Sequence, residues 1–252
     1  MQMSNEIENA IAAAADRISK ARHVFVLTGA GISAESGVPT FRGGGDSMVW
    51  RGMPFEVLSS KQMVESDLPL VWEWFDHRKG VVGECRPNTG HVALARAQVH
   101  PGFESFTLVT QNVDGLHDAA GSVSVIELHG NIHRARCSRC GSIRGLSDFP
   151  GGIRPPECPV CGSPMRPDVV LFGEILPEEA IFEAQRGAVG CDVCLVVGTS
   201  GLVYPANELP RVAGASGACV IEVNPEETVL TRGCDISIRM NSAEALPRIL
   251  PS

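Results

Sequence analysis

The fold of this chain is decided by residues 23–42, HVFVLTGAGISAESGVPTFR, where an apolar run passes directly into a glycine turn. Residues 24–28 have the composition of a buried strand. Gly29 and Gly31 have no Cβ, so a turn here can bring the backbone amides at the start of a helix close to a phosphate. The spacing Gly-x-Gly-x-x-Ala is typical of a loose dinucleotide-binding fingerprint, although a purely structural turn has the same pattern.

The sequence after this turn departs from an ordinary dinucleotide-binding unit. Such a unit continues into a second strand, and an acidic residue about 20 positions on holds the ribose. Here Pro-Thr-Phe-Arg at 39–42 and three glycines at 43–45 indicate a loop instead. We therefore expect a nucleotide to be held differently from that in a dehydrogenase, which disfavours an ordinary NAD oxidoreductase.

Length, charge and hydropathy narrow the class of protein. The 252 residues, 44% of them hydrophobic, are enough for one substantial core with a smaller appended module. A net charge of −8 disfavours nucleic acid and membrane surfaces as partners. The sequence has neither a leader-like start nor an apolar run of about 18 residues, so we expect a cytoplasmic protein. The oligomeric state is not encoded in any pattern that we recognise.

Helical and strand patterns alternate along most of the chain. This alternation predicts an α/β fold, a Rossmann-like parallel sheet with helices on both faces and a small zinc-binding domain beside it. The expected helices are 6–21, 89–99 and 178–189, and the expected strands are 24–28, 106–110, 123–128, 194–197, 219–223 and 236–238. Composition divides the chain into a discontinuous Rossmann-like domain (1–42, 88–133 and 168–252), a helical insertion (43–87) and a zinc-ribbon module (134–167).

Two Cys-x-x-Cys pairs within the last of these segments predict a metal site. Cys137 and Cys140 form one pair, and Cys158 and Cys161 form the other, at a separation typical of zinc ribbons. A redox pair or chance spacing are the alternatives. A third pair, Cys191 and Cys194, opens an apolar run; we interpret both as strand residues, whose thiols point to opposite faces and pack in the core.

Polar side chains follow several of the expected strands, where a parallel sheet collects its ligands. They are Gln111, Asn112, Asp114 and His117 after the second strand, His129 after the third, Gly198, Thr199 and Ser200 after the fourth, and Asn224 and Glu226 after the fifth. A neutral imidazole such as that of His129 can accept a proton from a sugar hydroxyl. Turn residues, a helix cap and a structural histidine are the alternatives for the individual positions.

Taken in series, these motifs resemble those of the sirtuins, a family of NAD-dependent protein lysine deacylases. The matching motifs are Gly-Ala-Gly-Ile-Ser with Pro-Thr-Phe-Arg, Thr-Gln-Asn-Val-Asp-Gly-Leu-His, Glu-Leu-His-Gly, the two Cys-x-x-Cys pairs, Phe-Gly-Glu at 172–174, Gly-Thr-Ser and Asn224. The resemblance covers about residues 21–250. It implies a large nucleotide-binding domain, a small zinc domain, and a cleft between them where NAD and an acyl-lysine peptide meet.

The resemblance also implies roles for single residues. His129 would be the general base, with Asn112 the second catalytic residue. The four cysteines at 137, 140, 158 and 161 would hold one structural zinc. By similarity, NAD would be held by Gly29, Ala30, Gly31, Ser33, Pro39, Phe41, Arg42, Gln111, Asn112, Asp114, Gly198, Thr199, Ser200, Asn224, Glu226 and, at a looser motif, Ser242.

The implied reaction consumes NAD. The acyl oxygen attacks C1′ of the ribose as nicotinamide leaves, His129 assists a ribose hydroxyl, and the products are free lysine, nicotinamide and O-acyl-ADP-ribose. An extended peptide would lie between Phe172, Gly173 and Glu174 on one side and Val203 on the other. A mono-ADP-ribosyltransferase and a non-catalytic NAD or ADP-ribose sensor remain as alternatives.

The acyl preference is less clearly encoded. Sirtuins that remove succinyl and malonyl groups carry a Tyr-x-x-Arg pair, and this chain has Phe75 and Arg78 at the matching place. Arg78 still offers a bidentate grip on a carboxylate, whereas Phe75 lacks the hydroxyl. We therefore expect acetyl-lysine as substrate, with some activity on acidic acyl groups. A solvated helix arginine is the alternative for Arg78.

Overall fold

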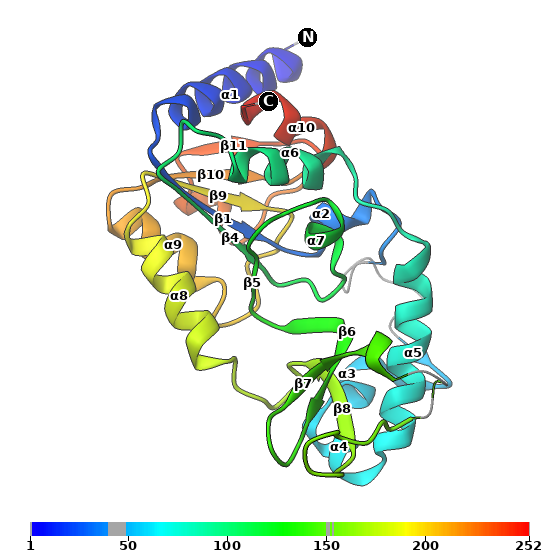
Figure 1. Cartoon of the computed structure of the whole chain (residues 1–252). Coiled ribbons are helices and arrows are strands. Elements are labelled where there is room, and N and C mark those ends of the chain that lie inside the picture. Colours follow the sequence, from blue (N-terminus) through cyan, green and yellow to red (C-terminus); the bar gives the residue numbers. More distant parts are fainter. Residues whose placement is uncertain (1, 40–48, 150–151, 153, 252) are drawn as a thin grey trace.

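The computed structural model describes residues 2–39, 49–149, 152 and 154–251 and shows a large and a small part (Figure 1). The large part is built on a six-stranded sheet in which every pairing is parallel. Its strands, in spatial order, are β11 (Ile236–Ile238), β10 (Cys219–Val223), β9 (Val193–Val197), β1 (His23–Thr28), β4 (Ser105–Thr110) and β5 (Ile126–Glu127). The expected α/β fold is confirmed.

Helices cover both faces of this sheet because alternate residues of its strands point to opposite sides. In β1, Val24 and Val26 belong to one core cluster, and Phe25 and Leu27 belong to the other. The first cluster includes residues of α1 (Gln2–Lys20), α6 (Thr89–Gln98) and α10 (Ser242–Ile249), and the second includes residues of α8 (Glu178–Val189) and α9 (Glu208–Ala215). Among the described residues, the helices include none that is long and apolar enough to cross a membrane.

Strand β5 is shorter than the sequence predicts. The pattern indicated a strand over 123–128, but only Ile126 and Glu127 pair with β4. Ahead of them, the Gln98 side chain donates to the Ser124 carbonyl and accepts from the Val123 amide. These bonds tie the segment to the end of α6, so a tertiary contact overrides the local strand propensity.

The small part combines a three-stranded antiparallel sheet with one long helix and two short ones (Figure 1). Trp72, buried in the longest of these helices, donates from its Nε1 to the Met165 carbonyl at 2.8 Å and so fixes the helix to the sheet. The elements are β6 (Gly130–Cys137), β7 (Ile143–Gly145) and β8 (Met165–Val169) in the sheet, the hairpin β2 (Val49–Trp50) and β3 (Met53–Pro54), and the helices α3 (Phe55–Leu58), α4 (Lys61–Ser66) and α5 (Leu68–Glu84).

Two of the segments that connect the two parts run side by side. The chain leaves the large sheet after β5 and enters β6 at Gly130, and it returns after β8 at Val169, the residue that pairs with Gly130. The small sheet therefore begins before and ends after the segment 134–167 that composition had set apart. The remaining described elements are α2 (Ala30–Ala34), α7 (Leu116–Ala119) and single turns of 3-10 helix at Leu146–Asp148 and Thr231–Gly233.

Candidate functional site

Three residues expected near a nucleotide form one hydrogen-bonded cluster at the carboxyl edge of the large sheet. The Asn112 side chain donates to the Gly29 carbonyl at 3.0 Å and to the Ser33 hydroxyl at 3.1 Å. The Ser33 hydroxyl donates to Asp114 Oδ2 at 2.7 Å. The turn after β1 and the turn after β4, far apart in sequence, thus share a single polar site.

A second cluster joins the ends of β4, β9 and β10. The Gln111 side chain donates to the Thr199 hydroxyl at 3.0 Å, and the Asn224 side chain donates to the Thr199 carbonyl at 3.2 Å. The Glu226 amide in turn donates to Asn224 Oδ1 at 3.2 Å. The polar residues predicted after these three strands therefore lie along one rim.

The glycine turn is closely packed against the end of β9. The amide of Gly29 donates to the Val197 carbonyl, and that of Gly31 donates to the Gly198 carbonyl at 2.7 Å. A Cβ on Gly31 would lie 2.6 Å from the Gly198 Cα, and Gly198 itself has a φ of +58°. These two amides are used within the protein, and the absence of a Cβ at both glycines allows the close approach of the two turns. That amides at the start of the following helix approach a phosphate stays a prediction.

His129 lies between the two parts of the molecule with its tautomer fixed. Its Nδ1 is 2.7 Å from the Gln111 carbonyl oxygen, which only accepts hydrogen bonds, so Nδ1 carries the proton. The Nε2 lone pair is then left for an incoming proton. Burial lowers the pKa of His129, although the hydrogen bond to Gln111 opposes this, and the imidazole is therefore neutral near pH 7. The geometry suits a general base.

Two buried histidines lie behind this rim: His117, which the sequence placed among the polar residues after the second strand, and His91, which sequence reasoning did not assign to the site. The rings of His91 and His117 meet edge to face at 5.0 Å. His117 Nε2 contacts the Thr28 hydroxyl at 3.0 Å, and His91 Nε2 lies 3.4 Å from the Ser33 hydroxyl. The available signal for His91 was its spacing from Asn88, with which it forms a capping box at the start of α6.

The other residues expected to hold the cofactor are found in varied settings. Phe41 and Arg42 lie outside the described residues. The side chain of Glu226 is exposed, whereas Ser242, the first residue of α10, is buried. Ala30, Pro39 and Ser200 are half-buried.

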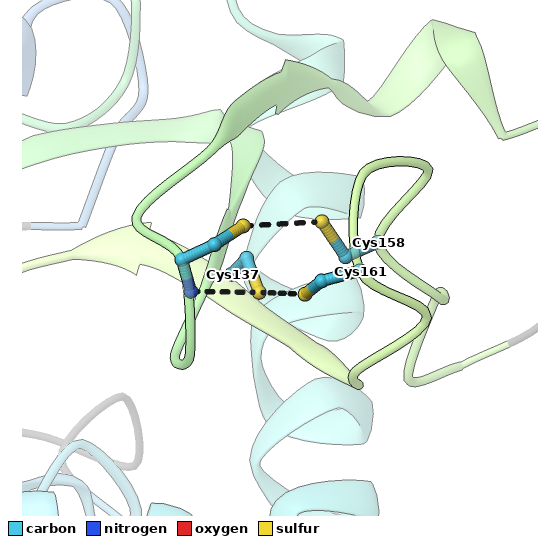
Figure 2. Close-up of side chains that lie close together, drawn as sticks. Cys137, Cys158 and Cys161 are labelled. Carbon is cyan, nitrogen blue, oxygen red and sulfur yellow. Dashed lines mark hydrogen bonds between the residues drawn. The ribbon is translucent and has the colours of Figure 1, made fainter.

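The four cysteines of the first two Cys-x-x-Cys pairs meet at one point of the small part (Figure 2). Their sulfur atoms all lie within 4.8 Å of one another, and the Cys137–Cys161 and Cys140–Cys158 distances are 3.5 and 3.6 Å. A tetrahedral zinc with bonds of about 2.3 Å needs sulfurs about 3.8 Å apart, so the donor set fits zinc. Hydrogen bonds from Ser163 lower the pKa of the Cys161 thiol to about 6, which favours the thiolate that a metal requires.

The third cysteine pair does not belong to this centre. Cys194 is in β9 as expected, but Cys191 precedes that strand, so its prediction as a strand residue was wrong. Its thiol donates to the Ala188 carbonyl at the end of α8. Burial raises the pKa of Cys191 to about 11 and that of Cys194 well above its usual range, as expected for packed thiols.

The loop expected to bind a peptide is braced from within the small part. The Glu174 carboxylate pairs with the Arg166 guanidinium and accepts from the Leu171 amide at 2.9 Å. The Phe172 amide donates to the Ser59 carbonyl, while its aromatic ring is exposed. Glu174 therefore shapes the loop, and Phe172 presents an apolar surface. Val203, in the loop that follows β9, is also exposed.

The two residues considered for acyl recognition both lie on α5. Phe75 is 6% exposed and packs in the core of the small part with Ile132 and Leu171. Burial lowers the pKa of Arg78, and the nearby charge of Asp114 opposes that shift. Arg78 is half-buried, and its Cζ lies 5.7 Å from the centre of the Trp74 ring on the same helix.

Comparison with known proteins identifies the family to which this architecture belongs. The model of the Sir2 family matches residues 29–205, which is more than half of the chain. The chain belongs to the Sir2 family. This confirms the resemblance to the sirtuins drawn from the motifs.

Individual relatives cover nearly the whole chain. NAD-dependent protein deacylase 2 of Pyrobaculum aerophilum is 48% identical over 236 residues, or 94% of this chain and 93% of its own. A Sir2 homologue solved as a complex with NAD superposes with a TM-score of 0.85 at 39% identity, over 94% of this chain and 91% of that one. A Sir2 homologue variant solved with 2′-O-acetyl-ADP-ribose has a TM-score of 0.84 at 38% identity, over 94% of both chains.

Proposed function

We propose that this protein removes acyl groups from protein lysine side chains and transfers them to the ADP-ribose part of NAD. The observation that carries the proposal is the orientation of the neutral imidazole of His129. The Gln111 carbonyl accepts from its Nδ1, so its Nε2 lone pair is left to accept a proton. The hydrogen-bonded cluster of Asn112, Ser33 and Asp114 follows Gln111 along the same edge of the sheet. The Sir2 relatives support the same reaction. One is named a protein deacylase, and two solved structures are complexes with NAD and with 2′-O-acetyl-ADP-ribose.

Different residues act on the ribose end and on the adenosine end of NAD. When bound, NAD supplies the glycosidic bond whose cleavage frees nicotinamide and makes C1′ accept the acyl oxygen. Asn112 and Asp114 orient the ribose end, and Thr199 with Asn224 holds the adenosine end. His129 Nε2 accepts the proton of a ribose hydroxyl as that oxygen bonds to the acyl carbon. One water molecule then adds to the acyl carbon, the carbon–nitrogen bond breaks, and the lysine leaves as the free amine. General-base assistance of the kind given by His129 contributes about 10²–10⁴-fold to a rate.

The first prediction tests this reaction directly. Incubated with NAD and an acetyl-lysine peptide, the protein releases nicotinamide and deacetylated peptide in equal amounts, and omission of NAD abolishes both. We expect His129→Ala to lower kcat by about 10²–10⁴-fold while NAD affinity, measured by calorimetry, stays within about threefold.

Each rival function has its own outcome in this assay. Transfer of labelled ADP-ribose to protein without turnover of the acyl peptide would establish an ADP-ribosyltransferase. NAD binding with no turnover on any peptide of an acyl panel would establish a sensor. Either result would contradict the deacylase.

The second prediction concerns the acyl group. The substrate preference that we propose is acetyl-lysine with weaker activity on succinyl- and malonyl-lysine, because the half-buried Arg78 guanidinium lies close enough to Asp114 for that charge to act on its pKa. A charge-assisted bond to a carboxylate contributes about 1.5–3 kcal/mol. Arg78→Met is therefore expected to lower the ratio of succinyl to acetyl kcat/KM by about tenfold or more.

Lys79→Met provides the matched control, since Lys79 is the next residue of α5 and pairs with Asp76 instead. This variant should leave the ratio of the two substrates unchanged. If Arg78→Met also leaves it unchanged, the carboxylate grip is wrong and acyl choice is made elsewhere.

A further inference from the structure

We propose that Arg134 is a positioning residue that joins the two parts of the molecule and thereby fixes His129 between them. Its guanidinium bonds to Glu127 on the large sheet and to Asp168 on the small sheet. The inference rests on the function proposed above, because it treats His129 as the group that takes the ribose proton.

His129 is anchored to both parts of the protein by different atoms. Its ring bonds to the Gln111 carbonyl at the end of β4, in the large part. Its own carbonyl accepts a hydrogen bond of 2.9 Å from the Val170 amide, on the segment that leaves β8. A small rotation of one part against the other therefore moves the His129 backbone relative to the carbonyl that orients its ring.

The backbone at this junction packs closely at Gly130 and pairs irregularly beyond it. Gly130 has a φ of +79°, and a Cβ there would lie 2.1 Å from the Asp168 carbonyl oxygen. The pairing of β6 with β8 is irregular between Gly130 and Ala135. The two segments therefore pack backbone to backbone at Gly130, whereas the regular pairing is interrupted between Gly130 and Ala135, and side chains link the strands over that interval.

Arg134 supplies a link across this irregular region. Its Nη2 lies 2.5 Å from Glu127 Oε2, and its Nε lies 2.9 Å from Asp168 Oδ2. The other Glu127 oxygen accepts from the Asn131 side chain at 2.6 Å. The side chains thus close a ring of interactions around the segment 127–134, and His129 lies inside that segment.

The burial of the two carboxylates makes this bridge persistent. The side chains of Asp168 and Glu127 are 2% and 13% exposed, and a buried carboxylate without its cation is costly. Burial tends to lower the pKa of Arg134, but the charges and hydrogen bonds of Glu127 and Asp168 raise it overall. The guanidinium therefore stays charged, and its planar fork serves two acceptors at once.

Arg136 offers a matched comparison on the same strand. Its Nε donates to Asp168 Oδ1 at 2.7 Å, and its side chain is 42% exposed against 36% for Arg134. Arg136 thus neutralises the same carboxylate from within the small sheet. Comparing the two arginines separates the bridge between the parts from the mere neutralisation of Asp168.

The test uses the full-length, zinc-loaded protein with NAD and an acetyl-lysine peptide. We expect Arg134→Gln to lower kcat by about 10–100-fold, as an error of about 1 Å in a reacting group does, while the KM for NAD stays within about threefold. Arg136→Gln should stay within about threefold of the parent in kcat. Arg134→Lys, which keeps the charge but lacks the fork, should recover part of the loss.

Hydrogen exchange of peptides covering 127–131 and 168–171 provides a readout that needs no turnover. Exchange in these peptides should be faster in Arg134→Gln than in Arg136→Gln or the parent. Zinc content, measured for every variant, should be unchanged. The double variant Glu127→Gln with Arg134→Gln should lose no more kcat than Arg134→Gln alone, because both changes break one bridge.

Three results would overturn the proposal. The first is an equal loss of kcat in Arg134→Gln and Arg136→Gln, and the second is an Arg134→Gln variant in which only the KM for NAD changes. The third is an unchanged rate of hydrogen exchange in both peptides of Arg134→Gln. A parent protein without turnover on any acyl peptide would refute the proposed function instead. In that case the exchange comparison still decides whether Arg134 holds the junction.

Discussion

His91 and His117 link the polar site to the pH dependence of stability. Burial lowers the pKa of His91 to about 4 and that of His117 to about 3. Because the folded-state pKa is below the unfolded value of about 6.5, the unfolded chain binds more protons as the pH falls. The stability present above pH 6.5 is therefore lost progressively below it, by about 2 kcal/mol per histidine at pH 5.

Denaturant unfolding at pH 7.5 and at pH 5 measures this third prediction. The difference in unfolding free energy between the two pH values should shrink by about 2 kcal/mol in His117→Gln. His100→Gln, which removes an imidazole from outside this cluster, serves as the control. An unchanged difference in His117→Gln would mean that the buried ring is not the group that titrates.

Single residues differed in how well the sequence predicted them. His129 was predicted because it follows an apolar strand within a motif that resembles the sirtuins, and its neutral, oriented ring agrees with the role expected of it. The role of His91 in the site was not predicted, because a histidine three residues after Asn88 is explained equally well by helix capping. Its contact with Ser33 depends on the packing of α6 against the glycine turn, which no local pattern encodes.

At the scale of elements, burial decides which patterns are informative. Strands β9 and β10 are almost wholly buried, so their apolar runs gave nearly correct bounds. Strand β5 was overestimated because the side chain of Gln98, in another element, holds the segment before it. The antiparallel sheet of the small part has weak periodicity, because thiol ligands and Trp72 supply stability that longer sheets draw from apolar alternation.

The glycine turn shows how one pattern of residues can meet more than one structural requirement. The strand and turn at 23–31 are where the sequence predicts them, but Gly29 and Gly31 are needed for contact with Gly198 and Thr199. The sequence alone does not show whether a glycine makes room for a phosphate or for a neighbouring backbone, because both close contacts require the absence of a Cβ. The placement of β9 beside β1 shows the backbone contact, and the phosphate contact stays a prediction.

At the scale of the whole molecule, the four-cysteine centre lies in the small part, away from the six-stranded sheet. All three tryptophans of the chain lie in the small part, with Trp50 in β2 and Trp72 and Trp74 in α5. Trp72 packs in one cluster with Cys137 and Cys158 and bonds to the Met165 carbonyl. Tryptophan emission is therefore a selective probe of the zinc-bearing part, while the far-ultraviolet circular dichroism reports largely on the helices of the large part.

The last prediction follows from this separation. Removal of zinc by a chelator should expose Trp72 and shift its emission to longer wavelength, because thiolates freed from the metal no longer hold β6 and β8 together. Most of the helical signal should remain, since α1, α6, α8, α9 and α10 pack on the six-stranded sheet. Cys140→Ser should mimic the chelator, and Cys219→Ser, in β10, should not. If the emission shift and the loss of the helical signal occurred at the same chelator concentration, the two parts would instead unfold as one unit.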